Sequence, residues 1–221
     1  MNIDLTGARV LVIGASGGIG NAAADAFAAA GAEVFRPSRG ELDFTDDASV
    51  AAWFAGADAF DHVVIAAAQT RTGTVAGLAL EDAQAAMNSK FFGAYRVAKI
   101  VQINQGGSLT FVSGFLSQRP SPASVLQGAI NAALEALARG LALEKAPVRV
   151  NTVSPGLVDT PLYAGMSPDD RQAMFERAAA RLPARRPGKP QDIASAILFV
   201  ATNPFATGST VTVDGGGTIA S

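Results

Sequence analysis

Four glycines near the start of the chain have the spacing of a phosphate-binding loop. The stretch "RVLVIGASGGIG" runs from an apolar segment into Gly14, Gly17, Gly18 and Gly20, and an alanine-rich segment follows. Glycines at such a turn let the backbone approach a pyrophosphate closely, and the next helix offers free N–H groups and a positive dipole end. Glycines also make plain turns, so such a loop alone is a weak signal. Its place between an expected strand and an expected helix favours nucleotide binding.

The composition offers few side chains for metal binding or thiol chemistry. The chain has no cysteine and a single histidine, His62. Disulfides, thiolate catalysis and cysteine-zinc sites are therefore excluded, and we expect no metal site. His62 opens the apolar run "HVVIAAA", so a structural histidine at a strand edge is the favoured interpretation. The composition is compatible with a reducing compartment, and we expect a cytoplasmic protein.

Length and charge limit the fold and the partners. The chain has 221 residues, of which 49% are apolar and 16% charged, with a net charge of -2. These values are typical of one folded α/β unit, so we expect residues 1–221 to form a single domain. No block of like charges indicates nucleic acid or an anionic membrane as a partner. The first residues, with an early Asp4 and a short apolar run, resemble neither a signal peptide nor a membrane span.

Short β-rich runs alternate with longer alanine- and leucine-rich runs. The strand candidates are 9–14, 33–36, 62–68, 108–113, 148–154 and 209–214, with a weak seventh near 41–44. Helical runs include 18–30, 80–102, 124–145 and 191–202. Most strand candidates are continuously apolar, as expected for parallel strands buried on both faces. The rhythm predicts a doubly wound, Rossmann-like parallel sheet of about seven strands with helices on both faces.

The segment 157–190 is the least regular part of the chain and is rich in proline and arginine. Its middle predicts a capped helix, in which Ser167 is the N-cap and Pro168 the first helical residue. We expect this segment to form a lid over a substrate.

Taken together, the motifs resemble those of the short-chain dehydrogenase/reductase family over nearly the whole chain. The matching stretches are "GASGGIG", "LDFTDDASV", "AMNSKFFGAY", "VRVNTVSPGLVDTP" and the C-terminal "RPGKPQDIASAILFVATNPFATGSTVTVDGGG". The resemblance implies an oxidoreductase that transfers a hydride between a nicotinamide cofactor and a carbonyl or alcohol substrate.

The resemblance also implies which residues contact the cofactor. They are Gly14, Ser16, Gly17, Gly18, Ile19 and Gly20 in the loop, Asp43 and Phe44 at the adenine, Ala66, Ala67 and Ala68 after the third strand, Asn131 at the ribose, and Pro155, Gly156, Val158 and Thr160 at the nicotinamide.

The expected catalytic residues depart from the family. Aligning "AINAAL" with the family's "ASKAAL" puts Gln127 at the tyrosine that acts as general acid and Asn131 at the lysine that supports it. Neither amide can release a proton at neutral pH. Asn88 matches the asparagine that supports the active site. Ser113 is the candidate for the catalytic serine, although a strict register puts Gly114 there and Ser113 could simply end a strand.

The proton must then come from another group. Water held by Ser113 is one candidate, and Tyr163 and Lys90 are the nearby titratable side chains. For Tyr163 we favour packing within the lid, and for Lys90 a solvated helix face. Tyr95 and Lys99 have the family's internal spacing but belong to another helix, where they are expected to pack or to face solvent.

The end of the second strand predicts the cofactor. A carboxylate there binds the adenosine ribose 2′-hydroxyl, whereas a basic residue binds a 2′-phosphate. In this chain the family's selector position falls at Ser38, and Arg39 follows. Both can bind a phosphate, although Arg36 and Arg39 could equally be solvated loop charges. The missing carboxylate predicts NADP(H) in preference to NAD(H).

Three functions remain open from the sequence, and the weakest of them is non-redox chemistry on the same fold. The first is an NADP(H)-dependent oxidoreductase with a non-standard proton route and a small-molecule substrate. The second is a non-catalytic NADP(H)-binding protein, such as a redox sensor or a partner subunit. The helix with Leu134, Leu137 and Leu141 often forms a dimer interface in the family, which implies a homodimer or homotetramer; ordinary core packing is the alternative.

Overall fold

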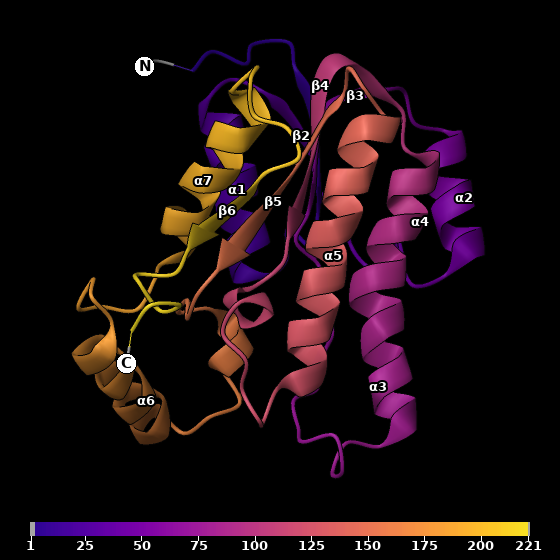
Figure 1. Ribbon diagram of the computed structural model, residues 1–221. Coiled ribbons are helices and arrows are strands. Elements are labelled where there is room, and N and C mark those ends of the chain that lie inside the picture. The colour runs from indigo at the N-terminus through magenta and orange to yellow at the C-terminus, as the bar shows by residue number, and fades with distance from the viewer. Residues whose placement is uncertain (1–2, 221) are drawn as a thin grey trace.

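The first strand shows why the sheet is buried on both faces. The computed structural model describes residues 3–220 (Figure 1). In β1 (Arg9–Ile13), Leu11 and Ile13 belong to one hydrophobic core, and Val10 and Val12 belong to the other. Successive strand residues point to opposite faces, so a continuous apolar run serves two cores at once.

All strands of the described sheet are parallel, in the order β2-β1-β3-β4-β5-β6. The others are β2 (Glu33–Phe35), β3 (Phe60–Ile65), β4 (Ile103–Val112), β5 (Arg149–Pro155) and β6 (Thr210–Val213). The chain moves outward from β1 to β2 and then crosses back to β3 on the other side of β1. The carboxyl ends of β1 and β3 therefore border the crevice where such sheets bind ligands. The predicted doubly wound parallel sheet is confirmed.

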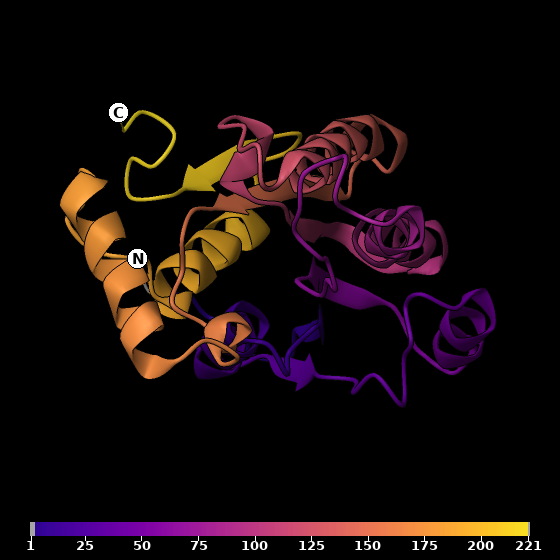
Figure 2. The same ribbon diagram turned by 90° about the horizontal axis from the view of Figure 1, so that it is seen from below.

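Helices cover both faces of the sheet (Figures 1 and 2). The core on one face includes residues of α1 (Gly18–Ala29) and α7 (Pro190–Thr202). The core on the other face includes residues of α2 (Asp47–Ala55), α4 (Gly93–Ile100) and α5 (Val125–Glu144). Leu134 and Leu141 of α5 are buried in this second core and Leu137 packs against it, so these leucines stabilise the fold itself.

Two sequence predictions of secondary structure were wrong. The weak strand near 41–44 is a turn, in which the backbone N–H groups of Glu41 and Leu42 both donate to the carbonyl of Ser38, at 3.1 and 3.0 Å. The described sheet consequently has six strands rather than about seven. The helix expected over 80–102 is α3 (Leu80–Met87), a π-helical turn η1 (Asn88–Phe92) and α4.

The π-helical turn has a specific packing partner. The N–H of Gly93 donates to the carbonyl of Asn88, five residues earlier. The ring of Phe44 lies directly on Gly93, where a Cβ would lie 2.1 Å from a ring carbon. A π turn inserts one extra residue and changes the direction of the side chains within it. This change matters for the residues that follow Asn88.

The segment 157–190 leaves the sheet and returns to its own starting point. The N–H of Gly188 donates to Leu157 and the N–H of Asp159 donates to Gly188, both at 2.9 Å. Between them lie the 3-10 turn η3 (Pro161–Tyr163) and α6 (Pro168–Arg181). As predicted, the Ser167 hydroxyl caps α6 by accepting from the N–H of Asp170 at 3.1 Å.

His62 is a structural residue inside β3. It is buried, its Nδ1 lies 2.9 Å from the Ser108 hydroxyl, and its ring stacks on Phe27. Burial lowers its pKa to about 4, with a contribution from Arg149. Among the described residues, none of the helices has both the length and the apolar character needed to cross a membrane.

Candidate functional site

The glycine loop brings the ends of β1 and β3 into close contact. Gly14 has a φ of +92°, and a Cβ there would lie 2.6 Å from the backbone nitrogen of Ala67. The loop then enters α1, whose N-cap Gly17 supplies no side-chain cap. The first N–H groups of a helix have no partner within it. The loop therefore leaves donors and a positive dipole end for an outside anion.

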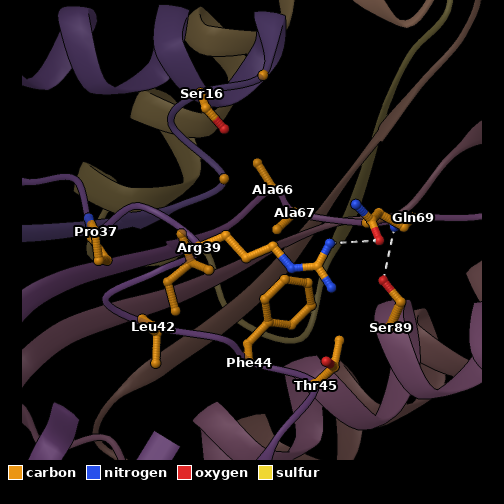
Figure 3. Close-up of a pocket in the computed structure, with 14 residues that line it drawn as sticks. Ser16, Pro37, Arg39, Leu42, Phe44, Thr45, Ala66, Ala67, Gln69 and Ser89 are labelled. Atoms are coloured by element: carbon orange, nitrogen blue, oxygen red, sulfur yellow. Dashed lines mark hydrogen bonds between the residues drawn. The ribbon is translucent and has the colours of Figure 1, made fainter. Parts of the chain in front are cut away.

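A first hollow, of about 200 Å³, lies between this loop and the turn that follows β2. Figure 3 shows the Arg39 side chain extending across it above the ring of Phe44. The guanidinium donates to Gln69 Oε1 at 3.1 Å and lies 3.7 Å from the Asp43 carboxylate. The Gln69 N–H in turn donates to the Ser89 hydroxyl at 2.8 Å. The lining includes the predicted cofactor residues Gly14, Ser16, Gly17, Arg39, Phe44, Ala66, Ala67 and Ala68.

Two predicted residues at this end do not line the hollow. The Asp43 carboxylate accepts from the N–H and hydroxyl of Thr45, at 3.0 and 2.6 Å, and these bonds hold its pKa low. The Asp43 side chain thus stabilises its own turn, and its contact with adenine stays a prediction. Ser38 is exposed, and its N–H donates to Glu41 at 2.7 Å. Among residues 3–220, no carboxylate side chain lines the hollow.

A second, larger cleft of about 1000 Å³ joins the first at Gly17, Ala66, Ala68 and Gln69. It runs between the glycine loop, the end of β4, the start of α5 and the 157–163 segment. The predicted residues that line it are Gly17, Gly18, Ile19, Gly20, Ala66, Ala68, Ser113, Gln127, Asn131, Pro155, Gly156, Val158 and Thr160. The sequence therefore identified fewer than half of the residues that line this cleft, including those of the glycine loop and the end of β5.

Gln127 is buried and its amide has one fixed orientation. Its Nε2 donates to the carbonyl of Arg71, whereas its Oε1 is buried with no partner among the described residues. Reversing the amide would place two acceptors against each other, so this orientation is the stable one. Gln127 thus lines the cleft with its amide oxygen enclosed by the protein.

The structure shows what surrounds Ser113 and Gly114, the two candidates for the position of the catalytic serine. The Ser113 hydroxyl donates to the buried carboxylate of Glu135 at 2.9 Å, and Ser117 donates to the same oxygen at 2.7 Å. A Cβ on Gly114, by contrast, would lie 2.8 Å from Asn131 Nδ2. The position that faces Asn131 therefore has no side chain. A contact of Ser113 with substrate stays a prediction.

Lys90 is the residue whose place sequence reasoning misjudged. Its side chain is half-buried in the cleft, and its Nζ donates to Asn131 Oδ1 and to the carbonyl of Ser113, both at 2.6 Å. The solvated helix face favoured from the sequence is wrong. Burial lowers the pKa of Lys90 to about 8, although Glu135 opposes this shift. The only sequence signal was a lysine among aromatic residues in "NSKFFG".

Asn88 lies at the base of this arrangement rather than in the cleft. Its Nδ2 donates to the carbonyl of Thr45 at 3.4 Å, which ties the π-helical turn to the chain that follows the first hollow. The Tyr95 side chain is exposed, as is Lys99, so the second Tyr-x-x-x-Lys spacing in the chain does not reach the cleft.

The start of the 157–190 segment closes one side of the cleft. A Cβ on Gly18 would lie 3.0 Å from both Thr160 and Pro161, so this segment packs against the glycine loop. Tyr163 lines the cleft and its ring meets Phe175 of α6 edge-on at 5.6 Å. Burial, with a contribution from Asp159, raises the pKa of Tyr163.

The two connected hollows fit a dinucleotide. The Gly17–Gly18 backbone lies where they meet and offers the uncapped start of α1 to a pyrophosphate. Arg39 lies at one end, and the buried acceptor of Gln127 lies at the other. Within residues 3–220, no three His, Asp or Glu side chains gather in a way that could hold a metal ion.

Known proteins of similar sequence are oxidoreductases by name. A family model described as enoyl-(acyl carrier protein) reductase matches residues 36–218. The 2,3-dihydro-2,3-dihydroxybenzoate dehydrogenase of Escherichia coli K12 is 31% identical, and the match covers 98% of this chain and 99% of that protein. The chain spans less of other curated relatives: 63%, 56% and 48% of a Malbranchea aurantiaca short-chain dehydrogenase/reductase, a Danio rerio carbonyl reductase and an Acremonium short-chain dehydrogenase/reductase.

Solved structures of similar proteins share the whole fold. A small-chain dehydrogenase in complex with NADPH superimposes with a TM-score of 0.91 at 38% identity, covering 96% of this chain and 99% of that one. The ligand-free aldohexose dehydrogenase of Thermoplasma acidophilum superimposes with a TM-score of 0.88 at 27% identity, covering 98% and 96% of the two chains.

Proposed function

The chain belongs to the short-chain dehydrogenase/reductase family, and on that premise we propose that it is an NADP(H)-dependent oxidoreductase that interconverts a carbonyl and an alcohol by a non-standard proton route. The observation that carries this proposal is the continuous cleft from Arg39, past the uncapped start of α1, to Gln127 and Asn131. A bound NADPH would supply the hydride.

The residues of the first hollow favour a cofactor with a 2′-phosphate. The hollow's lining includes Arg39 but no aspartate or glutamate of the described part of the chain. Arg39 is exposed and bonded only to Gln69 and Asp43 at the surface. Exposed pairs of this kind are worth about 1 kcal/mol or less, so Arg39 can leave them for a phosphate. Charge-assisted bonds to a phosphate then favour NADPH over NADH.

The cofactor preference can be measured by titrating NADPH and NADH against the purified protein. We expect NADPH to bind at least about tenfold more tightly, which corresponds to about 1.4 kcal/mol. Arg39→Ala should remove most of this preference by weakening NADPH alone, whereas Arg36→Ala, whose residue pairs with Asp25 outside the hollow, should not. Equal affinities in the wild type would contradict the proposal.

The second candidate is a non-catalytic NADP(H)-binding protein. Gln127 and Asn131 favour it, because neither amide titrates at the positions that face the cleft. Stopped-flow measurement of NADPH oxidation with a panel of aldehydes and ketones separates the two. Substrate-dependent oxidation supports the enzyme; tight binding of NADPH with no oxidation supports the binding protein.

We also propose that the chain is a single-domain, cytoplasmic homodimer or homotetramer with 157–190 as a substrate lid. Exposed apolar side chains on the helices, including Phe92, Tyr95 and Leu143, are compatible with self-association. Light scattering after size exclusion tests the assembly, and cell fractionation tests the location. Protection of 168–181 from hydrogen exchange by substrate would support the lid.

A further inference from the structure

Lys90 lines the cleft and bonds to Asn131, the position at which the family's helper lysine is missing. We propose that the Lys90 ammonium, held by Asn131 and the Ser113 carbonyl, is the proton donor to the substrate oxygen in carbonyl reduction. This inference rests on the proposed function. It assigns the reaction to a lysine from the π-helical turn instead of a tyrosine from α5.

Few polar side chains in the cleft can serve as the donor. The Gln127 Nε2 donates to the Arg71 carbonyl, and an amide cannot release a proton at neutral pH. The Ser113 hydroxyl donates to Glu135. Tyr163 and Lys90 remain among the titratable groups in the lining. Burial makes the Tyr163 phenol a weaker acid, because it raises its pKa.

The hydrogen bonds of Lys90 orient its ammonium group and leave one of its N–H bonds without a described partner. Its Nζ makes two described hydrogen bonds, to Asn131 Oδ1 and to the Ser113 carbonyl, each 2.6 Å long. An ammonium has three N–H bonds, so one remains for a ligand in the cleft. An asparagine suits position 131 because its oxygen accepts from Lys90, whereas a lysine there would repel the ammonium. The departure at residue 131 and the placement of Lys90 thus explain each other.

Charged groups around Lys90 come from three elements. Glu135 on α5 is buried and favours the ammonium form. Asp82 on α3 lines the same cleft but pairs with Arg71 at 3.3 Å. The 157–163 segment contributes the Tyr163 phenol, and the end of β4 contributes only the Ser113 carbonyl. Near neutral pH the lysine is therefore charged yet able to release a proton, since its pKa is about 8.

The chemical step balances simply. A bound NADPH would supply a hydride, which is one proton with two electrons, from a C–H bond of its nicotinamide ring to the substrate carbon, and the carbon–oxygen π electrons would move to oxygen. The Lys90 N–H bond breaks as an O–H bond forms, which yields the alcohol and a neutral amine. Water then returns a proton to the amine. Alcohol oxidation is the reverse, with neutral Lys90 as the base.

Steady-state kinetics with the purified protein tests the proposal. Lys90→Met should lower kcat for carbonyl reduction by about 10²–10⁴-fold while NADPH still binds. Lys90→Arg, which keeps the charge but cannot release a proton, should lose kcat similarly. Added ethylammonium should restore part of the rate in Lys90→Met. The exposed Lys99→Met is the matched control and should behave as wild type. Glu135→Gln should move the alkaline fall of kcat to lower pH, because the ammonium loses its favourable charge.

A second measurement does not depend on activity. In protein labelled with ¹³C at lysine Cε, the Lys90 signal, identified by its loss in Lys90→Arg, should titrate near pH 8. NADP⁺ carries a positive nicotinamide ring, so its binding should lower that midpoint. A Lys90 titration midpoint that does not move when NADP⁺ binds would overturn the proposal. So would a Lys90→Met variant with the wild-type kcat, or a loss of kcat that occurs in Tyr163→Phe but not in Lys90→Met. If the wild type reduces no carbonyl, the proposed function fails, and the NMR titration alone decides whether Lys90 lies beside the nicotinamide.

Discussion

Replacing Lys90 with methionine has a consequence for stability that is separate from catalysis. Burial lowers the pKa of Lys90 from 10.5 to about 8. Between these values the unfolded chain holds a proton at residue 90 that the folded protein has released. The free energy of unfolding of the wild type therefore rises with pH in this window, and the methionine variant lacks that rise.

The size of the effect follows from the same shift. The whole shift corresponds to about 3 kcal/mol. By proton linkage, slightly more than 1 kcal/mol of this change in the free energy of unfolding falls between pH 7 and pH 9. Because solvent reaches the half-buried side chain, we expect a change of about 1 kcal/mol. The free energy of unfolding of the wild type, measured relative to that of Lys90→Met, should thus rise by about 1 kcal/mol between pH 7 and pH 9. This rise does not depend on which protein is more stable at pH 7.

Urea unfolding provides the assay. Trp53 is the single tryptophan and stacks on Phe60 in the core, with ring centroids 6.2 Å apart, so its fluorescence reports global unfolding. Wild type, Lys90→Met and the surface control Lys99→Met would be unfolded at pH 7 and pH 9. Groups that titrate in all three proteins cancel in the differences. A wild-type advantage over Lys90→Met that stays constant between the two pH values would show that the ammonium is solvated, and the reasoning about its burial would fail.

Three further predictions concern parts of the fold that position the site. His62 has a folded pKa of about 4, so acidification from pH 6.5 toward 4 should cost the wild type up to about 3 kcal/mol that His62→Phe does not lose; equal acid sensitivity in urea unfolding would refute this. Gly14→Ala forces a Cβ to 2.6 Å from Ala67 at a φ of +92°, so it should lower stability by about 2 kcal/mol or more and abolish NADPH binding in a fluorescence titration; unchanged binding would contradict the tight packing of the loop. Ser167→Ala removes the cap of α6 and should cost about 1 kcal/mol locally, seen as faster hydrogen exchange confined to 168–181; unaltered exchange there would mean that the cap does not stabilise the helix.

Local patterns determined the architecture. Continuous apolar runs such as that in 9–14 are typical of strands buried on both faces, and their alternation with helical runs indicates a parallel sheet. The glycine loop and the Ser167 cap were equally predictable, because each depends on the backbone geometry of a few adjacent residues. The turn at 41–44 was mistaken for a strand because its apolar side chains, Leu42 and Phe44, pack inward from a turn.

The sequence by itself therefore determined the sheet, the glycine loop and part of the cleft lining, whereas the tertiary structure decided which side chains could do chemistry there. Lys90 meets Asn131 across 41 positions of sequence, through a π-helical turn that no local pattern indicated. The direction of a side chain on a helix turns by about 100° per residue, so one inserted residue changes the direction in which the side chains within the turn point. Ser113 likewise bonds to Glu135 because of how β4 ends beside α5. Such outcomes depend on the packing of distant elements, which periodicity and motif spacing do not contain.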